Sequence, residues 1–190
     1  MGRTSTVTRK TKETSVSVKL NLDGEGAARI EVPYGFLRHA LELLSKHSRI
    51  DLELTATGDL SHHVVEDAGI VLGEAFKEAL GDKAGIRRFG SAHVPMDDAL
   101  ARCVVDLSGR AHAVVDLGVT GGMVEDTPLE NFPHFFESFA HHCGANVHLH
   151  VLYGQNVHHV VEACFKALAL ALREAIRLEG GGVPSTKGVL

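Results

Sequence analysis

The 190-residue sequence predicts an α+β layered domain made of two similar halves, with helices packed between or against two sheets. The first observation is an internal repeat. Segments starting at Gly35 and Asn131 both read as helix, strand, glycine-containing turn and helix. The second observation is that the last helix of each segment opens with His-His-Val-Val-Glu, at 62–66 and 158–162. Five identical residues at matching positions indicate a gene duplication.

Periodicity defines the clearest individual elements. Apolar residues recur at helical spacing from 157 to 178, among many good helix formers. The stretches 50–56 (IDLELTA) and 147–153 (VHLHVLY) alternate apolar and polar residues, as half-buried strands do. The glycine-rich stretch 180–190 has a composition typical of a disordered tail.

Two hairpins are also expected. The stretch 14–22 alternates as a strand and ends in an Asp-Gly turn signal, so 28–32 is expected to return beside it. The stretches 92–105 and 111–117 flank a Ser-Gly-Arg sequence, which predicts a second hairpin-like turn.

Composition excludes several classes of function. Hydrophobic residues make up 44% and charged residues 23%, which is typical of a globular protein. The net charge of -5 gives no reason to expect a nucleic acid or an acidic membrane as partner. The polar segment 1–14 resembles neither a signal peptide nor a membrane span. Three scattered cysteines without CxxC spacing (Cys103, Cys143 and Cys164) indicate reduced thiols in a cytoplasmic protein.

The histidines carry the strongest functional signal. There are thirteen, and most lie between 39 and 63 or between 134 and 159, so a contiguous tag does not explain them. Without a matching partner in the other repeat, five are expected to be packing or surface residues: His93, His112, His141, His142 and His150. His148 stays open, because it lies on the strand that leads to His158.

The repeated pentapeptide has the spacing of a metal-binding motif. On a helix, Glu66 lies one turn from His62 and His63, so all three side chains share one side. Imidazole nitrogen together with carboxylate oxygen suits manganese, iron or zinc. Neighbouring histidines point about 100° apart and could serve two different metals. Further ligands must come from another element, and His39 and His134 occupy matching places in the two repeats.

Other polar motifs lie at predicted turns. Arg88 and Arg110 suit a bidentate grip on phosphate or carboxylate, and 185–188 (STKG) offers hydroxyl, backbone and ammonium donors. Taken singly, each is more typical of a solvated loop. Glu13, just before the first predicted strand, also has the pattern of a surface residue.

Taken together and in order, these motifs resemble the imidazoleglycerol-phosphate dehydratase family over nearly the whole chain. The matching stretches are 11–14 (TKET), 22–24 (LDG), 35–39 (GFLRH), 62–67 (HHVVED), 85–90 (GIRRFG), 95–97 (PMD), 106–110 (DLSGR), 154–163 (GQNVHHVVEA), 165–167 (FKA) and 185–190 (STKGVL).

The resemblance implies a fold of duplicated ribosomal-S5-domain-2-like halves, with helices layered between two four-stranded sheets. The first half-repeat would span 1–94, and the second would span 95–190 with a substrate-binding C-terminal tail, in one compact domain. It also implies trimers assembled into a shell of 24 subunits, active sites between subunits, and two manganese ions (Mn2+) per site. The substrate is a small-molecule phosphate.

The resemblance also assigns roles to individual residues. The implied metal ligands are His39, His62, His63, Glu66, His134, His158, His159 and Glu162. The implied substrate-binding residues are Glu13, His39, His47, His62, Glu66, Arg88, Arg110, Ser185, Thr186 and Lys187. Glu13 and Glu162 are the implied catalytic residues.

These residues suit the conversion of imidazoleglycerol phosphate to imidazoleacetol phosphate in histidine biosynthesis. The glycerol proton to be removed is not acidic, because no carbonyl adjoins it. Metal coordination of both ring nitrogens would stabilise an imidazolate that stores the electrons released in the elimination. A carboxylate such as Glu13 would shuttle the proton or protonate the departing hydroxyl.

Three departures from the family pattern fall in the first half. Arg38-His39-Ala40 stands where the family usually has Asp-His-Met, the loop before His62 is about three residues shorter, and Val64 replaces a threonine. Two alternatives therefore stay open. One is a metal-dependent hydrolase that uses the same ligands to activate water. The other is a metal-binding assembly with reduced activity.

Overall fold

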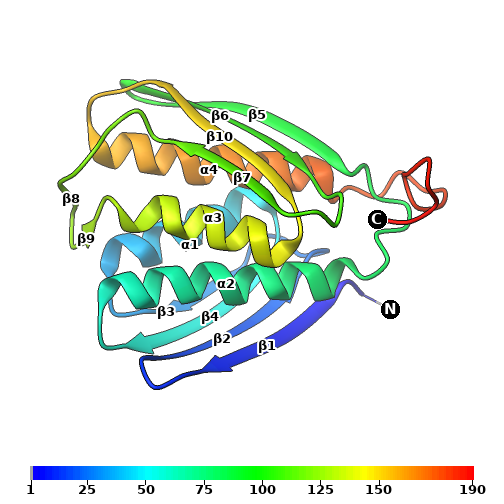
Figure 1. Ribbon diagram of the computed structural model, residues 1–190, viewed down its shortest axis with the longest axis horizontal. Coiled ribbons are helices and arrows are strands. Elements are labelled where there is room, and N and C mark those ends of the chain that lie inside the picture. The colour runs from blue at the N-terminus through cyan, green and yellow to red at the C-terminus, as the bar shows by residue number, and fades with distance from the viewer. Residues whose placement is uncertain (1) are drawn as a thin grey trace.

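Residues 2–190, which the computed structural model describes, form three layers in which four helices lie between two four-stranded sheets (Figure 1). The first half contributes β1 (Thr4–Lys10), β2 (Thr14–Asn21), β3 (Ala28–Glu31), α1 (Gly35–Ser48), β4 (Asp51–Gly58) and α2 (Ser61–Leu80). The second contributes β5 (Phe89–Met96), β6 (Ala99–Asp106), β7 (His112–Asp116), β8 (Met123–Val124), β9 (Thr127–Pro128), α3 (Asn131–Cys143), β10 (Asn146–Tyr153) and α4 (Val157–Ala175). The predicted α+β class is confirmed.

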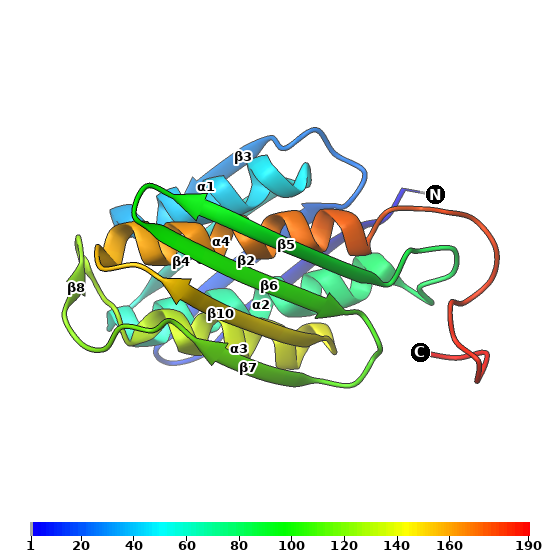
Figure 2. The same cartoon turned by 90° about the horizontal axis from the view of Figure 1, so that it is seen from above.

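The two large sheets have the same topology. Their strand orders are β1-β2-β4-β3 (Figure 1) and β5-β6-β10-β7 (Figure 2). In each sheet the last pair is parallel and the other two pairs are antiparallel. The helices also correspond: α1 precedes β4 and α3 precedes β10 in the sequence, and α2 and α4 follow these same strands. This correspondence supports the duplication inferred from the sequence.

The first predicted hairpin is wrong. The strand β3 does not pair with β2, since β4 lies between them and pairs with β3 in parallel. Parallel neighbours need a crossover connection, and α1 provides it between β3 and β4. The true hairpin partner of β2 is β1, in a segment for which the sequence predicted no strand. As an edge strand, β1 has no fully buried residue and therefore lacks a strong apolar signal.

The second predicted hairpin is also wrong. The stretch 92–105 is not one strand but parts of two, β5 and β6, which turn at Asp97 with φ +45°. The Ser-Gly-Arg turn leads from β6 to β7, but β10 separates these two strands in the sheet. A division at residue 94 falls inside β5, so we place the junction of the halves between α2 and β5.

The helical layer pairs helices from opposite halves. Figure 2 shows α1 beside α4 and Figure 1 shows α2 beside α3, and these are packed pairs. Gly69 and Gly73 allow α2 and α3 to touch backbone to backbone, because an added Cβ at either would lie 2.6 Å from a carbonyl oxygen of α3. Buried phenylalanines also meet across the halves: the rings of Phe76 on α2 and Phe139 on α3 are 5.3 Å apart, and Phe36 on α1 lies 5.4 Å from Phe132 on α3. The shared core therefore fixes the two halves relative to each other.

The tail 180–190 contains no helix or strand but is attached to the body. The amide of Gly85 donates to the Gly182 carbonyl at 3.0 Å, and Arg88 Nη1 donates to the Pro184 carbonyl at 2.9 Å. Within residues 2–190, no helix is long and apolar enough to cross a membrane.

Candidate metal centre

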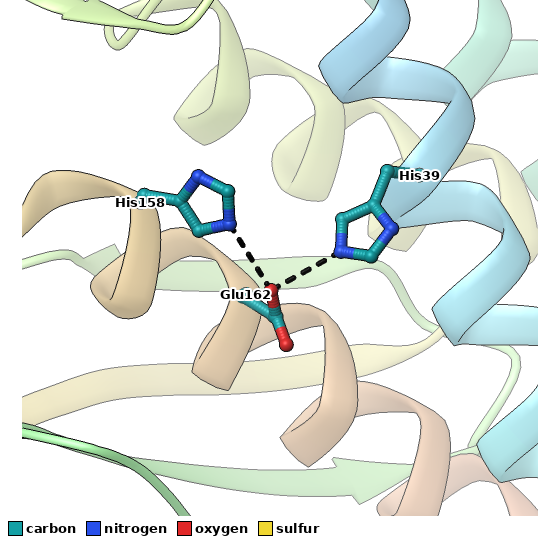
Figure 3. Close-up of side chains that lie close together, drawn as sticks. All are labelled: His39, His158 and Glu162. Atoms are coloured by element: carbon teal, nitrogen blue, oxygen red, sulfur yellow. Dashed lines mark hydrogen bonds and ion pairs between the residues drawn. The ribbon is translucent and has the colours of Figure 1, made fainter.

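Three potential metal ligands converge between α1 and α4. His39 Nε2 lies 3.1 Å from Glu162 Oε2, and His158 Nε2 lies 3.3 Å from the same oxygen. Figure 3 shows both rings directed at this carboxylate from two different helices. One ligand atom from each residue lies within 4.8 Å of the other two. Two imidazole nitrogens and one carboxylate oxygen at these distances form a donor set that fits a divalent metal.

Glu162 is the most enclosed member of this cluster, with 8% of its side chain exposed. Burial raises its pKa, but hydrogen bonds from Lys166 and His39 outweigh that effect and hold the pKa below the usual value. Lys166 Nζ lies 2.5 Å from Glu162 Oε1, so the carboxylate has one oxygen on the lysine and the other on the histidines. The cluster thus presents an ionised carboxylate.

A second cluster lies between α2 and α3. His62 Nε2 is 3.6 Å from Glu66 Oε2, and the rings of His62 and His134 are 5.0 Å apart. Its carboxylate is more exposed than that of Glu162, at 40% against 8%. Each pentapeptide therefore receives its additional histidine from the opposite half: His134 joins 62–66, and His39 joins 158–162.

The second histidine of each pentapeptide contacts a carboxylate outside its cluster. The ring of His63 is 6.1 Å from that of His62, and the ring of His159 is 6.0 Å from that of His158. His63 Nδ1 lies 2.8 Å from Asp59 Oδ1, and His159 Nδ1 lies 2.6 Å from Asp98 Oδ1. The hydrogen bond from His159 and the amides of 155 and 156 hold the pKa of Asp98 well below its usual range.

Glu13 lies in the turn between β1 and β2, beside the start of α2. Its side chain is 60% exposed, and Oε2 is 3.9 Å from His63 Nδ1. The Thr14 hydroxyl donates to the buried Asp67 carboxylate, and the amide of Asp59 donates to the Glu13 carbonyl at 3.1 Å. The structure therefore brings Glu13 close to the first-half ligands.

The predicted phosphate-binding residues Arg88 and the C-terminal tail lie at the end of the molecule opposite the start of α4. Arg88 donates to the Asp106 carboxylate at 2.7 and 3.1 Å as well as to the tail. Its amide donates to the carbonyl of Ala175, the last residue of α4. At about 1.5 Å per helical residue, Ala175 lies about 25 Å along the helix from His158. Figure 1 shows the red tail opposite the start of α4. Arg110, Thr186 and Lys187 are exposed, and Ser185 is half-buried.

His47 is half-buried near the end of α1, on the same helix as His39. Burial and the positive charge of Lys166 lower its pKa. It therefore belongs to the surroundings of the α1–α4 cluster and not to the tail.

Comparison with known proteins decides the family. The family model described as imidazoleglycerol-phosphate dehydratase matches residues 32–172. The chain belongs to the imidazoleglycerol-phosphate dehydratase family. Its members are metal-dependent hydro-lyases of histidine biosynthesis, and that activity class applies to this chain.

Similar proteins span the whole chain. The imidazoleglycerol-phosphate dehydratase of Chlorobium luteolum is 53% identical, over 99% of this chain and 96% of its own length. That of Citrifermentans bemidjiense is 50% identical over 100% of both chains. A solved structure of the dehydratase from Pyrococcus furiosus, in complex with (S)-C348, has a TM-score of 0.85 at 40% identity and covers 97% of this chain and 100% of its own. The Staphylococcus aureus enzyme has a TM-score of 0.83 at 31% identity and covers 92% and 99%.

The departures from the dehydratase pattern do not disrupt the clusters. Arg38 is exposed and forms no ion pair with any residue in 2–190, so its charge is not directed at His39 through a contact. Val64 is fully buried, on the core side of α2. The short loop changes the helix start: α2 has Leu60 at its N-cap without a side-chain hydrogen bond, whereas Asn156 caps α4.

Sequence reasoning gave no role to three residues near the ligands. Lys166 follows Glu162 by four positions on a helix, a spacing that could have revealed the ion pair. Asp59 precedes His63 by the same interval. Asp98 had no comparable signal, because 61 positions separate it from His159.

Proposed function

We propose that this dehydratase converts imidazoleglycerol phosphate to imidazoleacetol phosphate. Family membership supports the activity, and the two cross-half clusters support it most directly among the structural observations. The reaction removes a proton and a hydroxyl group as water from neighbouring carbons, and the enol that remains becomes the ketone of the product. The α1–α4 and α2–α3 clusters would each hold one divalent metal of an active site with two.

Manganese is the metal that we propose. Imidazole and carboxylate donors suit it, and the distances within the α1–α4 cluster are short enough for a shared ion. Bound to both ring nitrogens of the substrate, manganese would stabilise the negative charge that the elimination places on the ring. His39, His158 and Glu162 would hold one ion, and His62, Glu66 and His134 the other.

His63 and His159 complete this ligand set from a neighbouring subunit in our proposal. Each contacts a carboxylate outside the cluster of its own chain, Asp59 for His63 and Asp98 for His159, which fits ligands that are shared between copies. The Arg88 backbone lies at the far end of α4, about 25 Å along that helix from His158, and Arg88 also binds the tail, so we propose that a substrate touching both groups needs two chains. This separation supports a homo-oligomer, which we propose to contain 24 subunits built from trimers.

The remaining residues position substrate and move protons. Arg88, Arg110, Ser185, Thr186 and Lys187 would bind the phosphate group through charge-assisted hydrogen bonds. Glu13 would exchange a proton with the substrate through Oε2, which is exposed and lies 3.9 Å from His63. Glu162 would hold a metal ion and orient the ring of the substrate, and His47 would lie beside it.

We also place the enzyme in the cytoplasm. All three cysteines are buried and unpaired, as expected in a reducing compartment. No nucleic acid or membrane partner is proposed, because the net charge is -5.

One assay tests the proposed reaction. The purified protein is supplied with imidazoleglycerol phosphate and manganese, and formation of imidazoleacetol phosphate is followed before and after chelation. We expect product only in the presence of metal. A metal-loaded assembly that gives no product would contradict the proposal and favour the reduced-activity alternative. Release of inorganic phosphate instead would favour a hydrolase.

A further inference from the structure

The second histidine of each pentapeptide, His63 or His159, is held by a carboxylate at Nδ1. In the first half, Asp59 Oδ1 lies 2.8 Å from His63 Nδ1, and in the second half Asp98 Oδ1 lies 2.6 Å from His159 Nδ1. Both distances are those of charge-assisted hydrogen bonds. The two halves thus share a carboxylate–imidazole pair at equivalent histidines.

The pairs come from different places in the sequence. Asp59 lies on the loop just before α2 and reaches His63 from four positions upstream. Asp98 lies in the turn between β5 and β6, and its other oxygen accepts the amides of Gln155 and Asn156 at 2.8 and 3.1 Å. A feature copied with the duplicated segment would have used the same position twice. In the first half the equivalent turn, between β1 and β2, carries Glu13, whose Oε2 is farther from His63 Nδ1, at 3.9 Å, so a different element supplies the close carboxylate in each half.

The short first-half loop provides this contact. Asp59 is anchored by its own amide, which donates to the Glu13 carbonyl at 3.1 Å, while its carboxylate faces His63. The same residue therefore connects the turn that carries Glu13 to the histidine beside it. This arrangement gives the shortened loop a structural role that the family pattern did not reveal.

A carboxylate at Nδ1 determines which nitrogen of the ring can bind a metal. Nδ1 must carry a proton to donate to the carboxylate, so a neutral ring then offers its lone pair at Nε2. In His159, Nε2 lies 3.3 Å from the carboxylate of Asp97, whose side chain is 68% exposed, so a metal that binds this nitrogen takes the place of an exposed carboxylate. Hydrogen bonds of this kind orient metal-binding histidines and raise their basicity.

We infer that Asp59 and Asp98 are positioning residues that hold the rings of His63 and His159 through Nδ1 and so reserve Nε2 for a metal held mainly by another copy of the chain. The inference rests on the proposed metal-dependent function. It goes beyond that function by assigning these two carboxylates, which are not themselves metal ligands. Since Asp59 and Asp98 act through the imidazole ring, removing either should weaken metal binding and leave the fold in place.

Manganese titration of the metal-stripped, full-length protein tests the inference. Free Mn2+ is followed by electron paramagnetic resonance, which gives the number of ions bound per chain and their affinity. Asp59→Ala should weaken manganese binding about 10- to 100-fold, and Asp98→Ala should do the same. Asp59→Asn and Asp98→Asn keep an acceptor oxygen and should recover most of the affinity. Asp82→Ala is the matched control, because Asp82 accepts the amide of Ala84 but touches no histidine.

The outcomes distinguish failure of the proposed metal site from failure of the inference about Asp59 and Asp98. A wild-type protein that binds no manganese contradicts the proposed metal site itself. If the wild type binds manganese but Asp59→Ala binds it equally well, the inference is wrong while the metal site stands. Asparagine variants as weak as the alanine variants also overturn it, because loss of charge would then explain the effect. Asp98→Ala also removes the hydrogen bonds from the amides of Gln155 and Asn156. If that variant unfolds, the comparison of Asp59→Ala with Asp59→Asn tests the inference.

Discussion

His39 and Glu162 belong to opposite halves of a duplicated chain, yet His39 Nε2 lies 3.1 Å from Glu162 Oε2. The contact exists because α1 packs against α4 and not against the second helix of its own half. The same exchange brings His134 to His62. The intact chain therefore forms two clusters, each with candidate metal ligands from both repeats.

Removal of His39 should reduce metal binding at one cluster only. We expect His39→Ala to lower the number of tightly bound manganese ions, because a donor of the α1–α4 cluster is lost while the α2–α3 cluster keeps its three residues. Metal analysis after dialysis measures this change. His112→Ala is the control, since His112 is exposed on β7 and outside both clusters. An unchanged manganese content in His39→Ala would exclude His39 as a ligand.

Glu13→Gln should separate metal binding from turnover. The exposed carboxylate lies near His63 but belongs to neither cluster, so manganese content should stay as in the wild type. We expect kcat to fall about 100- to 10,000-fold, the usual effect of losing a general acid or base. Steady-state kinetics with parallel metal analysis checks both statements. Lys12→Gln, at the exposed neighbouring position, should retain activity; turnover that survives in Glu13→Gln would assign proton transfer to another group.

Lys187→Ala should weaken substrate binding more than it slows chemistry. The exposed tail lysine lies far from the α1–α4 cluster, and loss of one charge-assisted bond to phosphate costs about 1.5–3 kcal/mol. We therefore expect KM to rise about 10- to 100-fold with a smaller change in kcat. Lys19→Ala, on the exposed side of β2, provides the comparison. Equal kinetic constants for Lys187→Ala and the wild type would remove the tail lysine from the phosphate site.

The three thiols should resist alkylation in the folded protein. Burial raises the pKa of Cys143 to about 12 and also raises the pKa of Cys103 and Cys164, so the reactive thiolate is scarce near neutral pH. Raising the pH from 7 to 9 should add little reaction, because all three groups remain protonated. Iodoacetamide labelling followed by mass spectrometry should detect modification only after denaturant is added. Rapid labelling of the native protein would show that the core around these residues opens.

Local pattern predicted the elements that carry a strong apolar period. The helices that begin with the pentapeptides and the central strands β4 and β10 lie where the alternation and the helical spacing placed them. The same pattern missed β1, an edge strand in which Val7 is the one apolar residue among seven. It also paired β2 with β3, since a turn signal does not reveal that another strand will enter between its neighbours.

The sequence predicted which residues belong to the clusters but not which residues belong to the same cluster. Matching positions in the repeats marked His39 and His134, but only the packing of α1 on α4 and of α2 on α3 shows which pentapeptide each one joins. The contact of Asp98 with His159 is equally non-local, because it joins a strand turn to the start of a helix. Contacts within one helical turn, such as Lys166 with Glu162, were accessible from spacing alone.

The crossed ligand sets have a consequence for the origin of the molecule. A free chain carrying only one half would hold a pentapeptide and an upstream histidine on helices that do not form a cluster together. Two such chains would have had to associate before either cluster could exist, and dilution would have separated them. Joining the halves in one polypeptide makes that encounter intramolecular, with an effective concentration of about millimolar or above. In the fused chain, association of the two halves no longer depends on protein concentration.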